Sequence, residues 1–187
     1  LDGPFELNVQ PGPVGGDVSA NVQLSASGRA GGARLPGFIG LPDAIRMTGT
    51  ADWRLTGSIE RRGGGEQWPA RIEVATDLRG LGIDAPNPFA KAASEPRPTR
   101  LVLDVPGRGR TEVRIDSGAA RAALVFTERG DERWGLERGA ARFDAQPVTL
   151  PSRPGLHVGG DWPEFDLAEW LALRSATPSG RGLSDWL

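Results

Sequence analysis

Alternation of apolar and polar residues is the strongest pattern along this chain. Between Val18 and Ala26 every even position is apolar and every odd position is polar. Trp53, Leu55 and Ile59 follow the same rhythm, with charged and hydroxyl residues between them. Successive side chains of a β-strand point to opposite faces of its sheet. Each run therefore predicts a strand with one apolar face and one wetted face.

A glycine-rich turn joins the second of these runs to a third. After residues 63–65, which are all glycine, apolar residues recur at alternate positions from Trp68 to Leu78. Two alternating runs separated by turn-forming residues are typical of a hairpin. We therefore expect residues 53–59 and 68–78 to pair as one long antiparallel hairpin.

Shorter strand-like runs continue toward the C-terminus, and turn-type segments such as residues 106–109 and 129–131 separate several of them. Many short strands joined by turns predict a mainly β fold, built as a long antiparallel meander with one face buried and the other wet. The expected strands in this part of the chain are residues 101–105, 111–115, 121–126, 138–145 and 156–160.

Two segments break the alternation and are expected to be loops. Residues 28–42 are glycine-rich and irregular, and residues 84–99 contain four prolines. Proline cannot donate to a strand ladder, so the second segment cannot be a central strand. With these two loops, residues 1–187 are expected to form a single β-rich unit.

One short helix is expected near the C-terminus, over residues 165–173, followed by a tail over residues 174–187. Asp166 can cap the helix and Glu169 stands three residues later, as in a capping box. A helix of this length is too short to cover the apolar face of a long sheet. Something else must cover that face: a second sheet, a neighbouring protein or an apolar ligand.

Composition and charge exclude several classes of function. The formal charge is −2, and basic and acidic residues are interspersed, so the clustered basic stripe of a nucleic-acid binder is missing. Cysteine is absent, which excludes a disulfide framework, a thiolate nucleophile and a cysteine–zinc site. We expect no metal, no cofactor and no nucleic-acid partner.

Candidate catalytic residues are few. His157 is the single histidine, and one histidine without cysteine gives neither an ordinary zinc site nor a recognisable catalytic triad. A hydrolase would need a cluster of carboxylates, for which the candidates are Asp161, Glu164, Asp166 and Glu169. Turn and helix-cap chemistry explains most of these carboxylates, so we expect no enzyme activity and no catalytic residue.

Two stretches carry a resemblance to a known family. Residues 76–91 read TDLRGLGIDAPNPFAK, and residues 155–170 read GLHVGGDWPEFDLAEW. The first resembles a signature of the YhdP-like proteins of the AsmA-like superfamily, with Ala85 and Phe89 as mild departures from it. The second is similar to a strand-to-helix unit of the same family. The resemblance spans roughly residues 48–173.

The resemblance implies an envelope protein anchored in the inner membrane, whose periplasmic part is a β-sheet trough that conducts phospholipid toward the outer membrane. Residues 1–4 (LDGP) are an unusual native start, so we expect a segment of a longer chain. It would lie on the periplasmic side of the inner membrane and join adjoining segments of the same chain. Any membrane contact would be made through parts outside it.

These arguments lead to one main hypothesis and two alternatives. The main one is a curved, trough-like sheet that binds phospholipid acyl chains on its apolar face and helps to move phospholipid between the two membranes. The alternatives are a non-catalytic β-sandwich that recognises a glycan or a partner protein, and a hydrolase. The lipid-facing residues would be Val18, Val22, Leu24, Trp53, Leu55, Ile59, Ile72, Val74, Leu101, Leu103, Val113 and Ile115.

Overall fold

A computed structural model describes residues 4–34, 45–63, 68–107, 109–130, 133–161, 168–169 and 171. Almost all regular structure in this part of the chain is β-strand. A single turn of 3-10 helix, Gly32–Arg34, follows the second strand. The strands are β1 (Phe5–Pro11), β2 (Val18–Gly31), β3 (Arg46–Arg62), β4 (Ala70–Thr76), β5 (Leu81–Asp84), β6 (Thr99–Gly107), β7 (Arg110–Ser117), β8 (Ala120–Arg129), β9 (Arg133–Arg142) and β10 (Gly155–Gly159).

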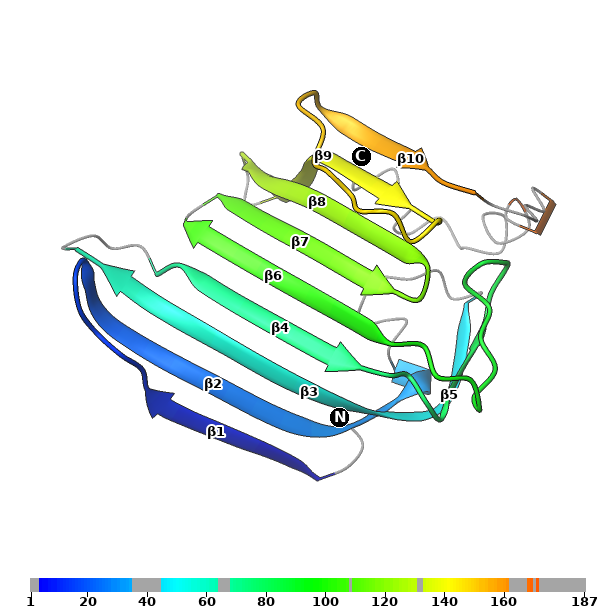
Figure 1. The fold of residues 1–187 in the computed structure, drawn as a ribbon, viewed down its shortest axis with the longest axis horizontal. Helices are drawn as coiled ribbons and strands as arrows, with labels where there is room; N and C mark the ends of the chain where they lie inside the picture. Colours follow the sequence, from blue (N-terminus) through cyan, green and yellow to red (C-terminus); the bar gives the residue numbers. More distant parts are fainter. Residues whose placement is uncertain are drawn as a thin grey trace.

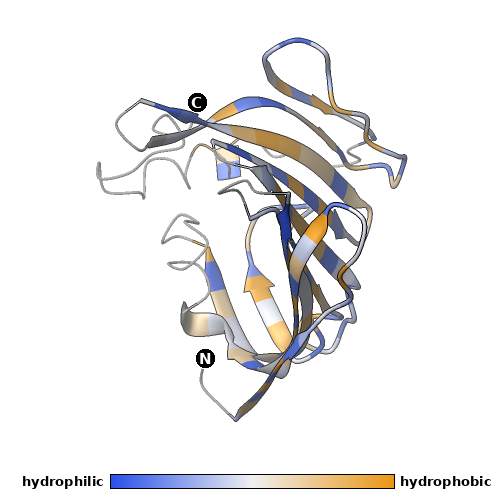
Figure 2. Cartoon of the chain, turned by 90° about the vertical axis from the view of Figure 1, so that its left-hand side faces the viewer, coloured by the Kyte–Doolittle hydropathy of each residue, from blue (hydrophilic) through white to orange (hydrophobic). Residues whose placement is uncertain are grey.

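The described strands form one sheet in the order β1-β2-β3-β4-β6-β7-β8-β9-β10, with β5 paired separately to β3 (Figure 1). All neighbours are antiparallel except β9 and β10, which run parallel. The sheet is curved, and strands β1 and β10 lie at its two edges (Figure 2). The predicted mainly β, meandering and trough-like fold is therefore confirmed, and the described strands do not form two packed sheets.

The hairpin predicted around the three glycines is confirmed, since β3 pairs antiparallel with β4. Other boundaries differ. The first expected loop begins later than predicted, because β2 continues through residues 28–31 in register with β3. Strand β9 covers residues 133–142 rather than 138–145. Strands β1 and β5 were not predicted, and the parallel β10 ends the antiparallel meander.

The expected C-terminal helix lies mostly outside the described residues. Ala168, Glu169 and Leu171 have helical backbone there. The expected tail, residues 174–187, lies wholly outside the described part.

One face of the sheet carries a ladder of ion pairs. Cross-strand partners meet directly, with Arg71 Nη1 at 2.6 Å from the Asp104 carboxylate. A diagonal pair lies beside it, because Arg100 donates two hydrogen bonds of 2.6 Å to the carboxylate of Glu73. This bonding lowers the pKa of Glu73. Further pairs on this charged face are Arg29–Asp52, Arg110–Glu112 and Arg121–Asp116.

Strand β3 changes partner part-way along its length. Residues 46–49 pair with β5, whereas residues 54–59 pair with β4. The change occurs at Gly49, which has a positive φ of 79° and lies against Gly80, whose φ is 90°. A Cβ on either glycine would collide with backbone of the other segment. Glycine at both positions thus lets β5 leave the main sheet while staying attached to β3.

The proline-rich segment is an ordered structure along one end of the sheet. Residues 85–98 contain no strand, as predicted, but they lead from β5 back to β6, which lies beside β4, and not to a second sheet. Phe89 meets the Phe143 ring edge-on, with centroids 5.7 Å apart. Through this contact the proline-rich segment, which starts directly after β5, packs against Phe143, the residue that follows β9.

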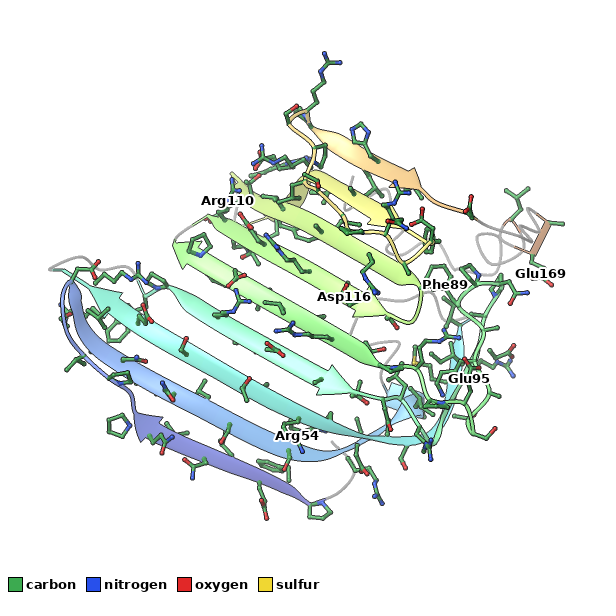
Figure 3. The ribbon with its side chains drawn as sticks, viewed as in Figure 1. Arg54, Phe89, Glu95, Arg110, Asp116 and Glu169 are labelled. Atoms are coloured by element: carbon green, nitrogen blue, oxygen red, sulfur yellow. The ribbon has the colours of Figure 1, made fainter. Side chains whose placement is uncertain are left out.

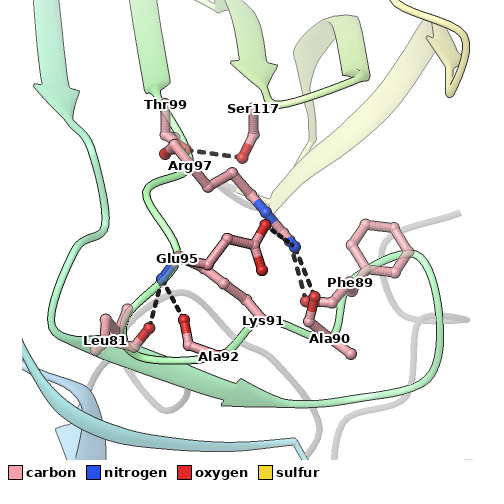
Figure 4. A network of polar contacts seen from close by, with 9 residues as sticks. All are labelled: Leu81, Phe89, Ala90, Lys91, Ala92, Glu95, Arg97, Thr99 and Ser117. Carbon is pink, nitrogen blue, oxygen red and sulfur yellow. Dashed lines mark hydrogen bonds and ion pairs between the residues drawn. The ribbon is translucent and has the colours of Figure 1, made fainter.

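Two cations hold this segment together, as Figure 4 shows. Lys91 is 5% exposed, and its Nζ donates to the carbonyls of Leu81 (2.8 Å) and Ala92 (2.9 Å). Burial lowers the pKa of Lys91. Arg97 donates to the carbonyls of Phe89 (3.2 Å) and Ala90 (2.6 Å). Backbone acceptors that no strand ladder uses are thus satisfied by side chains.

We expect Lys91→Met to destabilise the protein by about 1–3 kcal/mol, because the buried carbonyl of Leu81 and the partly buried carbonyl of Ala92 would lose their donor. Arg79→Met is the matched control, since Arg79 is exposed in the same part of the chain. Urea unfolding followed by circular dichroism measures both. Equal unfolding midpoints for the two variants would show that Lys91 does not hold the segment.

We expect Glu73→Gln to lower the free energy of unfolding near neutral pH but not in acid. The pKa of Glu73 is lower in the folded chain than in the unfolded chain. Its stabilisation is therefore present above the unfolded pKa, about 4.3, and is lost as the pH falls through the folded value. Urea midpoints at pH 7 and pH 3 measure this, with the exposed Glu6→Gln as control. A difference that persists at pH 3 would contradict the assignment.

Candidate functional site

The second face of the sheet is apolar from one edge to the other. Because β-strands pair in register, residues that are cross-strand partners lie side by side on the same face. One such set, row A, has an apolar side chain on every strand of the path. Its members, from β1 to β10, are Leu7, Ala26, Leu55, Val74, Leu101, Ile115, Ala122, Ala141 and Val158.

A second set, row B, runs beside row A, two residues along each strand. It also contains no polar side chain. Its members are Val9, Leu24, Gly57, Ile72, Leu103, Val113, Leu124, Gly139 and Leu156. A shorter row C adds Pro11, Val22, Ile59, Ala70 and Val105. Rows A, B and C together are called the apolar face here.

The size of the apolar face follows from strand geometry. Nine strands at a spacing of about 4.8 Å give it a length of about 38 Å across the sheet. Rows two residues apart are separated by about 7 Å along the strands. One leaflet of a bilayer has a hydrocarbon thickness of about 15 Å, half of the usual 30 Å. The apolar face is therefore longer than a single acyl chain spans in a membrane.

Burial is distributed differently on the two faces. Val125 is 0% exposed, yet it lies on the charged face between its cross-strand partners Glu112 and Arg138. Val102 and Ala123 are also buried on that face. No described side chain of rows A and B reaches this degree of burial. The charged face thus mixes fully buried and exposed residues, whereas on strands β2 to β9 the side chains of the apolar face are half-buried.

The edges of the apolar face are its most exposed parts. On β1, Leu7 and Val9 are 60% and 58% exposed, and on β10, Leu156 and Val158 are 45% and 59% exposed. Both rows therefore end, at either side of the sheet, on large apolar side chains in contact with solvent. Edge strands of this kind offer unpaired backbone groups to a further strand.

Ten of the twelve residues predicted to face lipid belong to rows A, B and C, and Trp53 lies on the same side of the sheet, two residues beyond Leu55 of row A; all eleven are half-buried. Val18 does not lie there. A bulge between Val18 and Ala20 places Val18 opposite Arg62, so that it is out of line with Val22. The remaining predicted residues are Val22, Leu24, Trp53, Leu55, Ile59, Ile72, Val74, Leu101, Leu103, Val113 and Ile115.

The sequence-based prediction missed the two flanks of the apolar face. Strand β1 had a usable signal, because Phe5, Leu7 and Val9 alternate with polar residues. Strand β8 had a weaker one, since residues 122–126 are apolar on both faces and alternation cannot tell which face is which. The contribution of β10 depends on its parallel pairing to β9, for which the sequence carries no local signal.

The two borders of the apolar face differ in chemistry. Beside row A, the hydroxyls of Thr76, Thr99 and Ser117 stand in one row. They bond within the fold: Thr99 Oγ1 and Ser117 Oγ lie 2.7 Å apart, and Thr76 accepts from the Leu78 amide. The proline-rich segment borders this side. Beyond row C, at the hairpin turns, the border carries Arg61 and Trp68.

The candidate catalytic residues lie toward the C-terminal end of the described part of the chain. No group of three or more histidine or acidic residues there could hold a metal ion. His157 is exposed and lies on the face opposite Leu156 and Val158. Asp161 is also exposed, whereas Glu164 and Asp166 lie outside the described residues. No helix in the described part of the chain has the length and hydropathy needed to span a bilayer.

Comparison with known proteins gives one positive result. No curated protein and no solved structure matches the chain significantly. A family model described as "YhdP protein" matches residues 1–184, almost the whole chain. The match includes β1 and β2, which the resemblance in the sequence motifs did not reach. The chain therefore belongs to the YhdP family.

Proposed function

We propose that this segment binds phospholipid acyl chains on its apolar face, as part of a periplasmic trough that helps to move phospholipid between the inner and outer membranes. The observation that carries the proposal is the pair of rows A and B, which cross nine strands without a polar side chain. Membership of the YhdP family supports the same function.

The energetics favour an apolar ligand over water on this face. Covering apolar surface contributes about 25 cal/mol per Å², or about 0.8 kcal/mol for each methylene group. On the charged face, many side chains pair with one another, as Arg71 does with Asp104 and Arg100 with Glu73. The apolar face has no such internal solution, because its side chains carry no groups that could pair. The role proposed here is non-catalytic and needs no cofactor.

We further propose that β1 and β10 pair with adjoining segments of the same full-length chain. A strand added to either edge would continue rows A and B, because those rows end on the exposed residues of β1 and β10. Such pairing would also satisfy the outward backbone groups of both edge strands. Attachment to the membrane would then be made by parts of the protein outside this segment.

The lipid-binding proposal predicts that the purified segment carries phospholipid. Solvent extraction and mass spectrometry would detect this lipid. Leu103→Gln should lower the affinity for lipid about tenfold, since it places an amide in the middle of row B and removes apolar contact. Asp104→Asn is the matched control, because Asp104 is the next residue of β6 and lies on the charged face.

Two results would count against lipid binding on this face. One is a folded segment that neither carries phospholipid after purification nor takes it up from vesicles. The other is an equal loss of binding in Leu103→Gln and Asp104→Asn, which would indicate that the two faces contribute alike. Circular dichroism of both variants establishes that they keep the strand content of the parent chain.

The edge proposal predicts slower amide exchange in β1 and β10 when the segment is part of its full-length chain than when it is isolated. Pairing with a further strand protects outward amides that are otherwise open to solvent. Hydrogen exchange with mass spectrometry measures this, and the central strand β6 is the internal control. Identical exchange of β1 in both forms would rule out an added strand at that edge.

A further inference from the structure

Arg61 is a cation at the border of an otherwise apolar surface. It is paired with Ala20 in the β2–β3 register, two residues beyond Ile59 of row C, and so it lies on the same side of the sheet. Rows A, B and C carry no charge. Among the described strand residues on this side, the other charged one is Glu128, which lies on β8, four strands away along the sheet path.

The guanidinium of Arg61 has an aromatic neighbour but no carboxylate partner among the described residues. Its central carbon lies 5.8 Å from the centroid of the Trp68 ring. Both residues are exposed, and Trp68 is 47% exposed. The adjacent Arg62 is different, because its Nη2 lies 2.8 Å from the carboxylate of Glu60. Within the described part of the chain, the guanidinium of Arg61 therefore has hydrogen-bond donors free for a ligand.

At the opposite border, the cations of the proline-rich segment are used within the fold. These cations are Lys91, which donates to the carbonyls of Leu81 in β5 and of Ala92, and Arg97, which donates to two carbonyls within the segment. The hydroxyl of Thr99 also bonds within the fold, because it donates a 3.1 Å hydrogen bond to the carbonyl of Arg97. A ligand on the apolar face that carries an anionic group would thus find a free donor at the turn border, beside Trp68.

We propose that Arg61, whose guanidinium lies over the Trp68 ring, binds the phosphate group of a lipid whose acyl chains lie on the apolar face. This inference rests on the proposed function and adds a polar anchor to it. A guanidinium matches phosphate oxygens with two parallel hydrogen bonds and stacks well on an aromatic ring. A tryptophan at the boundary between apolar surface and water is suited to both environments.

Two lipids with the same chains separate the polar anchor from the apolar face. Dioleoyl phosphatidic acid carries a phosphate, and dioleoylglycerol carries a hydroxyl in its place. We expect Arg61→Gln to weaken binding of phosphatidic acid about tenfold, the loss of roughly one charge-assisted contact, and to leave binding of dioleoylglycerol unchanged. Arg61→Lys, which keeps the charge but not the planar group, should lose less.

Arg54→Gln is the matched control. Arg54 lies on the same strand, is exposed, has no ion pair among the described residues and belongs to the charged face (Figure 3). The Arg54→Gln substitution changes the net charge by the same amount as Arg61→Gln, and it should leave the affinity for both lipids unchanged. Raising the salt concentration should reduce the preference of the parent chain for phosphatidic acid, since an exposed charge is screened.

The outcomes separate the anchor from the function on which it rests. If the parent chain binds neither lipid, lipid binding on the apolar face is itself wrong. If the chain binds both lipids and Arg61→Gln changes nothing, or weakens both equally, only the anchor is wrong. An equal effect of Arg54→Gln, or tight binding of inorganic phosphate without any lipid, would likewise overturn the anchor. Unfolding midpoints of the variants establish that each remains folded.

Discussion

The register of backbone hydrogen bonds is the constraint on which the two faces of this protein depend. Side chains alternate with a period of two, so a slip of one residue in any strand pair would move a whole strand's apolar set to the charged side. Rows A and B stay unbroken only because every pair along the path keeps register at these positions. Register shifts occur between Val18 and Ala20, between Asp104 and Gly107, and between Val125 and Phe126, and all three lie outside the two rows.

The central strands were predictable because their alternation is strict. Leu55, Ile72 and Val113 each stand between polar neighbours, so a period of two assigns both the strand and its face. Neighbouring strands that lie next to one another in the chain then pair by default. This reasoning assigned most of the apolar face to the correct side, and its error at Val18 arose from a one-residue bulge that alternation cannot show.

The remaining features depend on contacts between distant residues. The parallel pairing of β10 brings Leu156 beside Gly139, although the two are separated by a connection without strand structure. The proline-rich segment was correctly expected to lack strands, but its order depends on Lys91 reaching the carbonyl of Leu81 over 2.8 Å. The sequence marks Lys91 only as its single lysine. Neither feature has a local pattern from which it could be inferred.

The contrast between the two faces bears on how a sheet can stay open. Val125 is fully buried on the charged face, although that face meets water through its arginine and carboxylate groups. Long charged side chains cover apolar surface with their aliphatic parts while their ends remain hydrated, so such a face can be complete without a second layer. Leucine and valine cannot do this, because they have no polar end to leave in water. A single sheet with one face of each kind therefore needs a partner only on its apolar side, and a mobile ligand there leaves the fold itself unchanged.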